Sequence, residues 1–222
     1  MITLEVLDGA IELVSYTSDA TLVELRDTVD SFRHDKGLKT DHCAGCGECC
    51  YFDALPVLGH DLQAIKGYLN VADDVLFSAY LKLPEPPDLR NREKAISELI
   101  RDNELDGTTA ALFYEYNNSE PITLRKSAGG ACKFLQNDFC SIYGARLYTC
   151  GLYICSAGEK LSMLQEQIVR QGAWHSYSIM GWIERHAISH NPFLGHESLE
   201  TVTLASLDTD MEGALESLFF YF

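Results

Sequence analysis

The cysteines of this chain limit its fold more than any other feature, because they are crowded into two short segments. The first segment, DHCAGCGECCYF at residues 41–52, holds four of them with the spacing C-x2-C-x2-C-C: Cys43, Cys46, Cys49 and Cys50. Two residues between thiols let a loop direct its sulfur atoms at one ion or cluster. Gly45 and Gly47 give such a loop the backbone freedom that it needs.

The second segment has the spacing C-x7-C-x9-C-x4-C and contains the other four cysteines: Cys132, Cys140, Cys150 and Cys155. Residues 125–155 carry four basic side chains against the single acid Asp138: Arg125, Lys126, Lys133 and Arg146. Positive charge lowers the pKa of nearby thiols and stabilises thiolates. Basic residues also gather by chance on solvated surfaces, and the sequence leaves both interpretations open.

We interpret all eight cysteines as ligands of one metal-binding region that joins residues 43–50 to residues 132–155. Single buried cysteines are common in protein cores, but packing alone does not select four within eight positions. A disulfide framework is disfavoured, because 8 cysteines in 222 residues fall far below the density of small secreted scaffolds. His42, beside Cys43, could replace a cysteine, but the thiols alone supply enough ligands.

The ends and composition of the chain predict a cytoplasmic protein with reduced thiols. The N-terminus MITLEVLDGAIELVSY has no basic start and alternates in polarity, unlike a signal peptide. No apolar run approaches the ~20 residues that a bilayer span requires. The net charge of −16 repels phosphate backbones and anionic headgroups, so we expect neither nucleic acid nor membrane as a partner. A protein partner or protein substrate remains open, as does the oligomeric state.

The polarity pattern predicts an α+β fold: a mostly helical single domain over residues 1–222, with a short β-hairpin element and an irregular cysteine-rich metal-binding core. Within it, residues 43–155 contain the cysteine-cluster region and residues 156–222 form a C-terminal helical region. We expect a hairpin over 2–7 and 11–16, a helix capped by Ser18 or Asp19, helices over 59–69, 72–83, 91–105, 159–170 and 173–190, a strand at 121–126, and a second hairpin over 131–135 and 139–143.

Three further features give weaker expectations. The helix over 91–105 has a stripe that we expect to be buried: Ala95, Ile96, Leu99 and Ile100. His186 and His190 are four apart on a predicted helix, a spacing that can bind metal. No third ligand accompanies them, so helix-end capping or solvent exposure is the better explanation. The apolar end at 211–222 is expected to dock on the core, with an oligomer contact as the alternative.

The stretches CAGCGECC at 43–50 and CKFLQNDFCSIYGARLYTC at 132–150 resemble the CxxCxxCC cysteine-cluster family, a zinc- or iron-chelating domain. The resemblance extends to seven cysteines and three supporting positions: Cys43, Cys46, Cys49, Cys50, Cys132, Cys140, Cys150, Ile142, Tyr143 and Arg146. Some longer members are flagellin lysine N-methylases, which implies a distant relation to these enzymes.

The chain departs from the family pattern at three positions. Leu147 stands where the family usually has proline, Gly151 where it usually has arginine, and Cys155 where a proline or aromatic residue is common. Because Gly151 replaces the second arginine of the family pattern, any substrate or cluster contact that the family makes at this position is in doubt for this chain.

Eight thiolates could hold two zinc ions with four thiolates each, one [4Fe–4S] cluster with spare ligands, or two clusters. The C-x2-C-x2-C opening is that of a ferredoxin-type loop and favours iron, whereas the adjacent Cys49 and Cys50 keep zinc open. We expect an iron–sulfur protein acting in redox chemistry or in modification of another macromolecule. The alternative is a structural zinc adaptor without catalytic activity. No nucleophile motif, phosphate loop or G-x-G-x-x-G occurs, so no catalytic or cofactor-binding residue is assigned.

Overall fold

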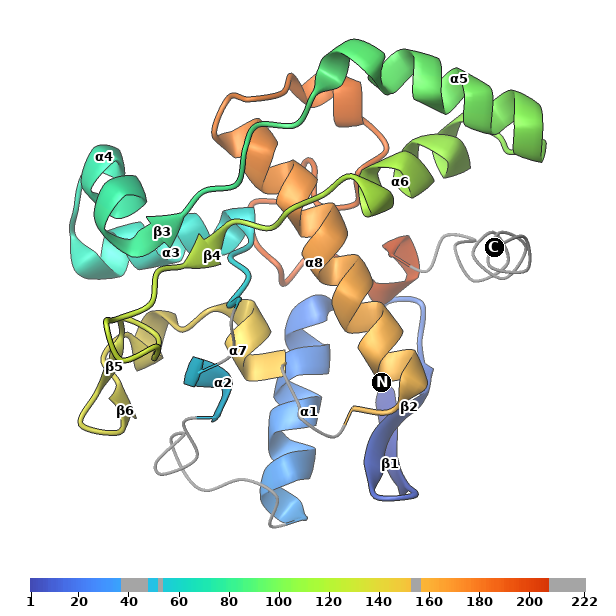
Figure 1. Cartoon of the computed structure of the whole chain (residues 1–222). Helices are drawn as coiled ribbons and strands as arrows, with labels where there is room; N and C mark the ends of the chain where they lie inside the picture. Colours follow the sequence, from blue (N-terminus) through green and yellow to red (C-terminus); the bar gives the residue numbers. More distant parts are fainter. Residues whose placement is uncertain (37–47, 52–53, 153–156, 208–222) are drawn as a thin grey trace.

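The computed structural model describes residues 1–36, 48–51, 54–152 and 157–207. The fold is α+β, as predicted, with helices joined by short antiparallel strand pairs (Figure 1). The helices are α1 (Leu22–Asp35), α2 (Glu48–Tyr51), α3 (Gly59–Leu69), α4 (Asp73–Val75), α5 (Arg92–Asn103), α6 (Gly107–Asn117), α7 (Tyr148–Leu152) and α8 (Glu159–Ile179). The strands are β1 (Ile2–Leu7), β2 (Ala10–Tyr16), β3 (Leu81–Lys82), β4 (Thr123–Leu124), β5 (Leu135–Gln136) and β6 (Phe139–Cys140).

The N-terminal hairpin of β1 and β2 confirms the prediction. Its tight turn is Asp8–Gly9, with φ of 50° and 83°, the left-handed values that a two-residue hairpin turn requires. The two strands pair from Ile2 opposite Tyr16 to Leu7 opposite Ala10. Leu4, Ile11 and Leu13 are buried, whereas Val6 and Leu7 near the turn are exposed, so only part of the hairpin packs on the core.

Helix α1 begins later than predicted, because its cap is Thr21 and not Ser18 or Asp19. The Thr21 hydroxyl accepts a hydrogen bond from the Glu24 N–H at 3.2 Å, and the Glu24 carboxylate accepts one from the Thr21 N–H at 2.9 Å. This reciprocal pair is a capping box, which satisfies two donors at the helix start.

Helix α8 is one continuous helix, so the predicted break near Gly172 and the second helix to residue 190 are wrong. Gly172 allows α8 to pack closely against Leu58 at the start of α3. A Cβ atom at this position would lie 2.5 Å from Cδ2 of Leu58. The helix ends before Gly181, which has φ of 72° and favours glycine. Between Gly181 and residue 190 the chain forms a 3-10 turn, Arg185–Ile188, in place of the predicted helix. Figure 1 shows α8 running through the middle of the molecule.

The helix predicted over 72–83 is helical only as far as Tyr80, and its end at 81–83 is wrong. Helix α4 passes into a π turn at Leu76–Tyr80, and the chain then enters β3, where Leu81 pairs with Leu124. Strand pairing therefore overrides helical periodicity in this segment.

Helix α5 confirms the helix predicted over 91–105, but the stripe expected to be buried is at most half-buried, and Ile100 is exposed. The reason is that α5 packs beside α6, which was not predicted, and both extend from the body in Figure 1. Helix α6 starts at Asp106, whose carboxylate accepts from the N–H groups of Thr108 and Thr109. Arg92 holds α5 to α6 through the buried Glu115 at 2.6 Å.

Two main hydrophobic cores lie on either side of the molecule. The hairpin-side core packs β1, β2, α1 and α8 around residues such as Leu13, Leu25 and Ile168. The cysteine-side core is formed by these buried residues: Leu55, Val57, Leu62, Ile65, Leu76, Leu81, Ile122, Leu124, Cys132, Phe134, Ile142 and Leu147. The segment 211–222 lies outside the described residues, and within them no helix has the length and apolar character to cross a membrane.

Candidate metal centre

The structure describes the side chains of four of the eight predicted ligands: Cys50, Cys132, Cys140 and Cys150. Cys43, Cys46 and Cys155 lie outside the described residues, as does His42. Cys49 is placed only as a backbone position in α2. The four described thiols all pack in or against the cysteine-side core, where Cys132 is buried and the other three are half-buried.

The two cysteine groups meet at Cys50 and Cys132. The backbone N–H of Cys132 donates a hydrogen bond to the carbonyl oxygen of Cys50 at 2.6 Å. The Lys126 ammonium donates to the same carbonyl oxygen at 2.9 Å, and Lys126 also forms an antiparallel bridge with Cys132. Helix α2, from the first group, is therefore attached to the start of the second group, far along the sequence.

A tight hairpin positions Cys140, as the sequence predicted. Strands β5 and β6 pair Leu135 with Cys140, and their turn is Asn137–Asp138, with φ of 52° and 64°. Asparagine and aspartate tolerate these left-handed values better than other non-glycine residues do. The Leu135 N–H also donates to the carbonyl oxygen of Cys132 at 3.0 Å, which joins the hairpin to Cys132.

A buried carboxylate fixes the helix that carries Cys150. Asp61, near the start of α3, accepts one hydrogen bond from the Leu58 N–H and another from the Tyr148 N–H, each at 2.9 Å. Complete burial raises the pKa of Asp61 to about 6, although these two N–H groups and Arg26 oppose the rise. Asp61 therefore caps its own helix and α7 together. Asp61 was not identified from the sequence. The one signal that could have found it is local: Asp61 stands three residues after Leu58, the spacing of a residue that caps the start of α3.

The basic residues predicted near the thiols have different roles. Lys126 contacts the Cys50 carbonyl, as described above. Arg146 pairs with Asp30 of α1 at 3.5 Å, and Lys133 donates to the Ala79 carbonyl oxygen at 2.6 Å. Arg125 is exposed. The basic segment is therefore in part a set of side chains that holds the cysteine region to the rest of the fold.

The family departure at Gly151 has a steric reason. A Cβ atom at Gly151 would lie 2.8 Å from Cδ of Arg26 and 3.4 Å from Nη2 of Arg146. Two guanidinium side chains thus already occupy the space beside α7, and no room is left for an arginine at position 151. Arg26 reaches this place from α1, which the sequence alone did not indicate.

The histidine pair is not a metal site of the kind that helical spacing allows. His186 lies in the 3-10 turn and pairs with Glu184 in solvent, while His190 lies 3.0 Å from the buried Glu115. Among the described residues, no three side chains of the types His, Cys, Asp or Glu gather closely enough to hold a metal ion. That statement covers only four of the eight cysteine side chains.

Comparison with known families decides where this arrangement belongs. The family model CxxCxxCC, "Putative zinc- or iron-chelating domain", matches residues 42–168, more than half of the 222-residue chain. The chain belongs to the CxxCxxCC family. The matched range contains all eight cysteines together with Asp61 and Lys126. Neither the curated proteins nor the solved structures give a match.

Membership in the CxxCxxCC family identifies the region as a zinc- or iron-chelating domain. The family description names both metals and does not choose between them. It also says nothing of flagellin lysine N-methylases, so that relation stays an expectation from the resemblance.

Proposed function

We propose that this member of the CxxCxxCC family holds an iron–sulfur cluster where α2, the β5–β6 hairpin and α7 converge. The observation that supports the proposal is the 2.6 Å hydrogen bond from the Cys132 N–H to the Cys50 carbonyl oxygen, because it brings one cysteine of each group together. The proposed ligands come from all eight cysteines: Cys43, Cys46, Cys49, Cys50, Cys132, Cys140, Cys150 and Cys155.

The donor chemistry and surroundings fit a thiolate-bound metal. Sulfur ligands select zinc, copper(I) and iron–sulfur clusters over magnesium or calcium. The described thiols pack against a largely apolar core, and such burial restricts solvent access and influences redox potential. The Lys126 ammonium at the Cys50 carbonyl places a positive charge beside the cysteines, which favours thiolates.

Iron–sulfur is preferred over zinc for two reasons. The C-x2-C-x2-C spacing of the first group is that of a cluster-binding loop. The local positive charge would also stabilise an anionic cluster. When bound, such a cluster supplies reversible electron transfer. The chain's own residues would hold its ligands in place: Asp61 fixes the start of α7, and Lys126 fixes the end of α2.

We infer a role in redox chemistry or in modification of another macromolecule, in the cytoplasm and with a protein partner or substrate. The acidic total charge of −16 supports a protein over a nucleic acid or a membrane as that partner. The competing function is a zinc-stapled adaptor that has no catalytic activity. It is supported by the adjacent pair Cys49–Cys50 and by the irregular second spacing.

Anaerobic purification, an absorbance spectrum and metal analysis test the proposal. We expect a coloured protein that contains iron and sulfide and that is reduced reversibly. A colourless sample with stoichiometric zinc, which loses its fold on chelation, would contradict the iron–sulfur proposal and favour the adaptor.

Two substitutions test whether the cysteine groups share a site. Cys46→Ser and Cys140→Ser should each lower the metal content, because each removes a ligand from a different group. Ser141→Ala is the matched control, since it changes an exposed hydroxyl next to Cys140 and should leave metal content unchanged. Full occupancy in both cysteine variants would show that no common site exists.

A further inference from the structure

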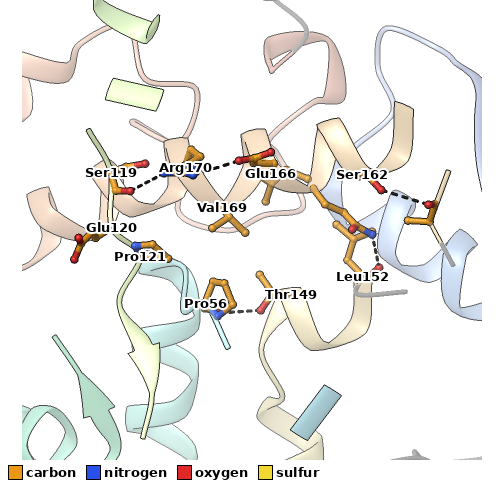
Figure 2. A pocket seen from close by; sticks show the side chains of 13 residues that line it. Pro56, Ser119, Glu120, Pro121, Thr149, Leu152, Ser162, Glu166, Val169 and Arg170 are labelled. Atoms are coloured by element: carbon orange, nitrogen blue, oxygen red, sulfur yellow. Dashed lines mark hydrogen bonds and ion pairs between the residues drawn. The ribbon is translucent and has the colours of Figure 1, made fainter. Parts of the chain in front are cut away.

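A cavity of about 590 Å³ lies beside α7 (Figure 2). It is bounded by α7, by α8 and by the segment 119–121 that follows α6. Its volume lies within the range of pockets that enclose small ligands, roughly 300–1,000 Å³. None of the residues assigned to metal binding lines it.

The walls of the cavity are mainly apolar. Pro56 and Pro121 lie on one side, Leu152 of α7 lies opposite, and Val169 of α8 lies between them (Figure 2). Ile168 of α8 also lines the cavity. Leu152 and Ile168 are buried, whereas Val169 is half-buried, so an apolar group in the cavity would cover the exposed part of Val169. These walls suit the apolar body of a ligand.

The charged residues of the lining lie toward one end of the cavity, whereas the uncharged Ser162 and Gln165 lie at the other end, near Leu152 (Figure 2). Arg170 donates from Nη1 to the Ser119 carbonyl oxygen at 2.9 Å and pairs through Nη2 with Oε1 of Glu166 at 3.3 Å. Burial, together with the carboxylate of Glu166, raises the pKa of Tyr116 to about 12, so its hydroxyl stays protonated beside that carboxylate. Arg170 is therefore already neutralised, and an anionic ligand would have to displace Glu166.

Glu120 carries the one charge of the cavity lining that no ion pair neutralises among the described residues. Its side chain is exposed at the same end of the cavity and pairs with no other side chain in the described part of the chain. With Glu166 matched by Arg170, the lining has one uncompensated negative charge. This end therefore favours a cationic group over an anionic one.

Helix α7 connects the cavity to the cysteine region. Thr149 and Leu152 line the cavity, and the Thr149 hydroxyl donates to the Pro56 carbonyl oxygen at 2.7 Å. Cys150, between them in the sequence, packs against the cysteine-side core. A ligand in the cavity would thus contact the helix that carries Cys150.

We propose that the cavity binds a small molecule with an apolar body and a cationic head, the head lying beside Glu120. Its effect on the metal centre, through α7, rests on the proposed function, whereas the binding itself does not. Hexylammonium is the probe, and hexanoate, which has the same number of carbons and the opposite charge, is its control.

The test is an NMR titration of the full chain with each probe, followed on the methyl groups of Leu152 and Val169. Hexylammonium should shift these signals saturably and bind about 1.4-fold to fivefold tighter than hexanoate, the range that one exposed charge pair allows. Equal affinity for the two probes, or shifts confined to other methyl groups, would overturn the proposal.

Two variants locate the binding. Val169→Phe should abolish it by filling the cavity, while Val75→Phe, at an exposed valine of α4, should not. If Val169→Phe does not fold, Glu120→Gln serves instead, since this exposed residue can change without loss of packing and should remove the preference for the cation. A Glu120→Gln protein that keeps that preference would refute the assignment of the head group.

Metal analysis of the same samples separates the two proposals. A protein that keeps its metal but does not bind hexylammonium contradicts the cavity proposal alone. A protein that binds hexylammonium but contains no metal supports the cavity and contradicts the proposed function.

Discussion

The hairpin-side core and the cysteine-side core bury similar aliphatic side chains, but different backbone elements hold them. Around the first lie a 14-residue helix, a 21-residue helix and strands of six and seven residues. Around the second lie the 11-residue helix α3 and described strands of two residues each. A two-stranded pair is marginal by itself in water, and these are very short. The comparison teaches that the cysteine-side core depends on contacts beyond regular secondary structure.

Those contacts are single hydrogen bonds between segments distant in the sequence. The Cys132 N–H to the Cys50 carbonyl, and the Tyr148 N–H to the Asp61 carboxylate, each join such segments. Bound metal would add links of the same kind, since ligands from both cysteine groups would meet at one centre. We therefore expect metal loss to affect the cysteine-side core far more than the hairpin-side core.

Truncating one buried leucine in each core tests this difference. Leu25→Ala and Leu124→Ala remove side chains that are 0% and 3% exposed, and each should lower the free energy of unfolding by about 2–5 kcal/mol. Only Leu124→Ala should also reduce metal content, because β4 leads directly to Lys126. Urea unfolding and metal analysis of both variants provide the measurement. Equal metal loss in the two variants would show that the cores are not independent.

Asp61 should make the link between the two cores depend on pH. Its pKa is about 6 in the folded chain against 3.8 as the usual value, so the group stabilises the fold most below pH 3.8 and this contribution is lost as the pH rises through 6. Asn at position 61 cannot ionise. Between these pH values the stability of the parent chain relative to Asp61→Asn should fall by on the order of 3 kcal/mol.

Thermal or urea unfolding of both proteins across this pH range measures the Asp61 effect. Asp61→Asn also loses one acceptor for a backbone N–H, which gives an offset independent of pH. Parallel curves for the two proteins would show that the Asp61 carboxyl titrates normally.

The smallest expected effect concerns the start of α1. Thr21→Ala removes the capping hydroxyl and should cost about 1 kcal/mol of stability, while metal content stays unchanged. Thr21→Ser keeps the oxygen and is the matched control. A loss of metal in Thr21→Ala would mean that the end of the hairpin-side core influences the cysteines, contrary to the comparison above.

Local patterns in the sequence predicted the turns and helices that depend on interactions between residues close in the chain. The Asp8–Gly9 turn, the Asn137–Asp138 turn and helix α3 follow from turn residues and periodicity within a few positions. Helix α6 was missed because its glycine and asparagines were interpreted as turns, whereas the Asp106 cap makes Gly107 the first helical residue and the asparagines stand at its end. The break predicted at Gly172 failed because a glycine in a helix can serve close packing as well as termination.

The sequence predicted the candidate metal ligands, but not the residues that hold the ligand-bearing segments in place. Cysteine spacing identified the region, and the family match over residues 42–168 agrees with it. Asp61, Arg26 and Pro56 contribute from distant segments, and nothing in their own sequence neighbourhoods indicates α7 as the common target. Such contacts arise only when tertiary packing brings the segments together.

The crossing of α3 and α8 restricts how this sequence can diverge. A Cβ atom at Gly59 would lie 2.5 Å from Cδ1 of Ile179, and one at Gly172 would lie equally close to Leu58. Because α3 contributes to the cysteine-side core and α8 to the hairpin-side core, these two positions determine how near the halves lie. Any ancestor or descendant that gained a methyl group at either position would have needed the side chain across the crossing to move aside or become smaller, so the pairs should tend to change together.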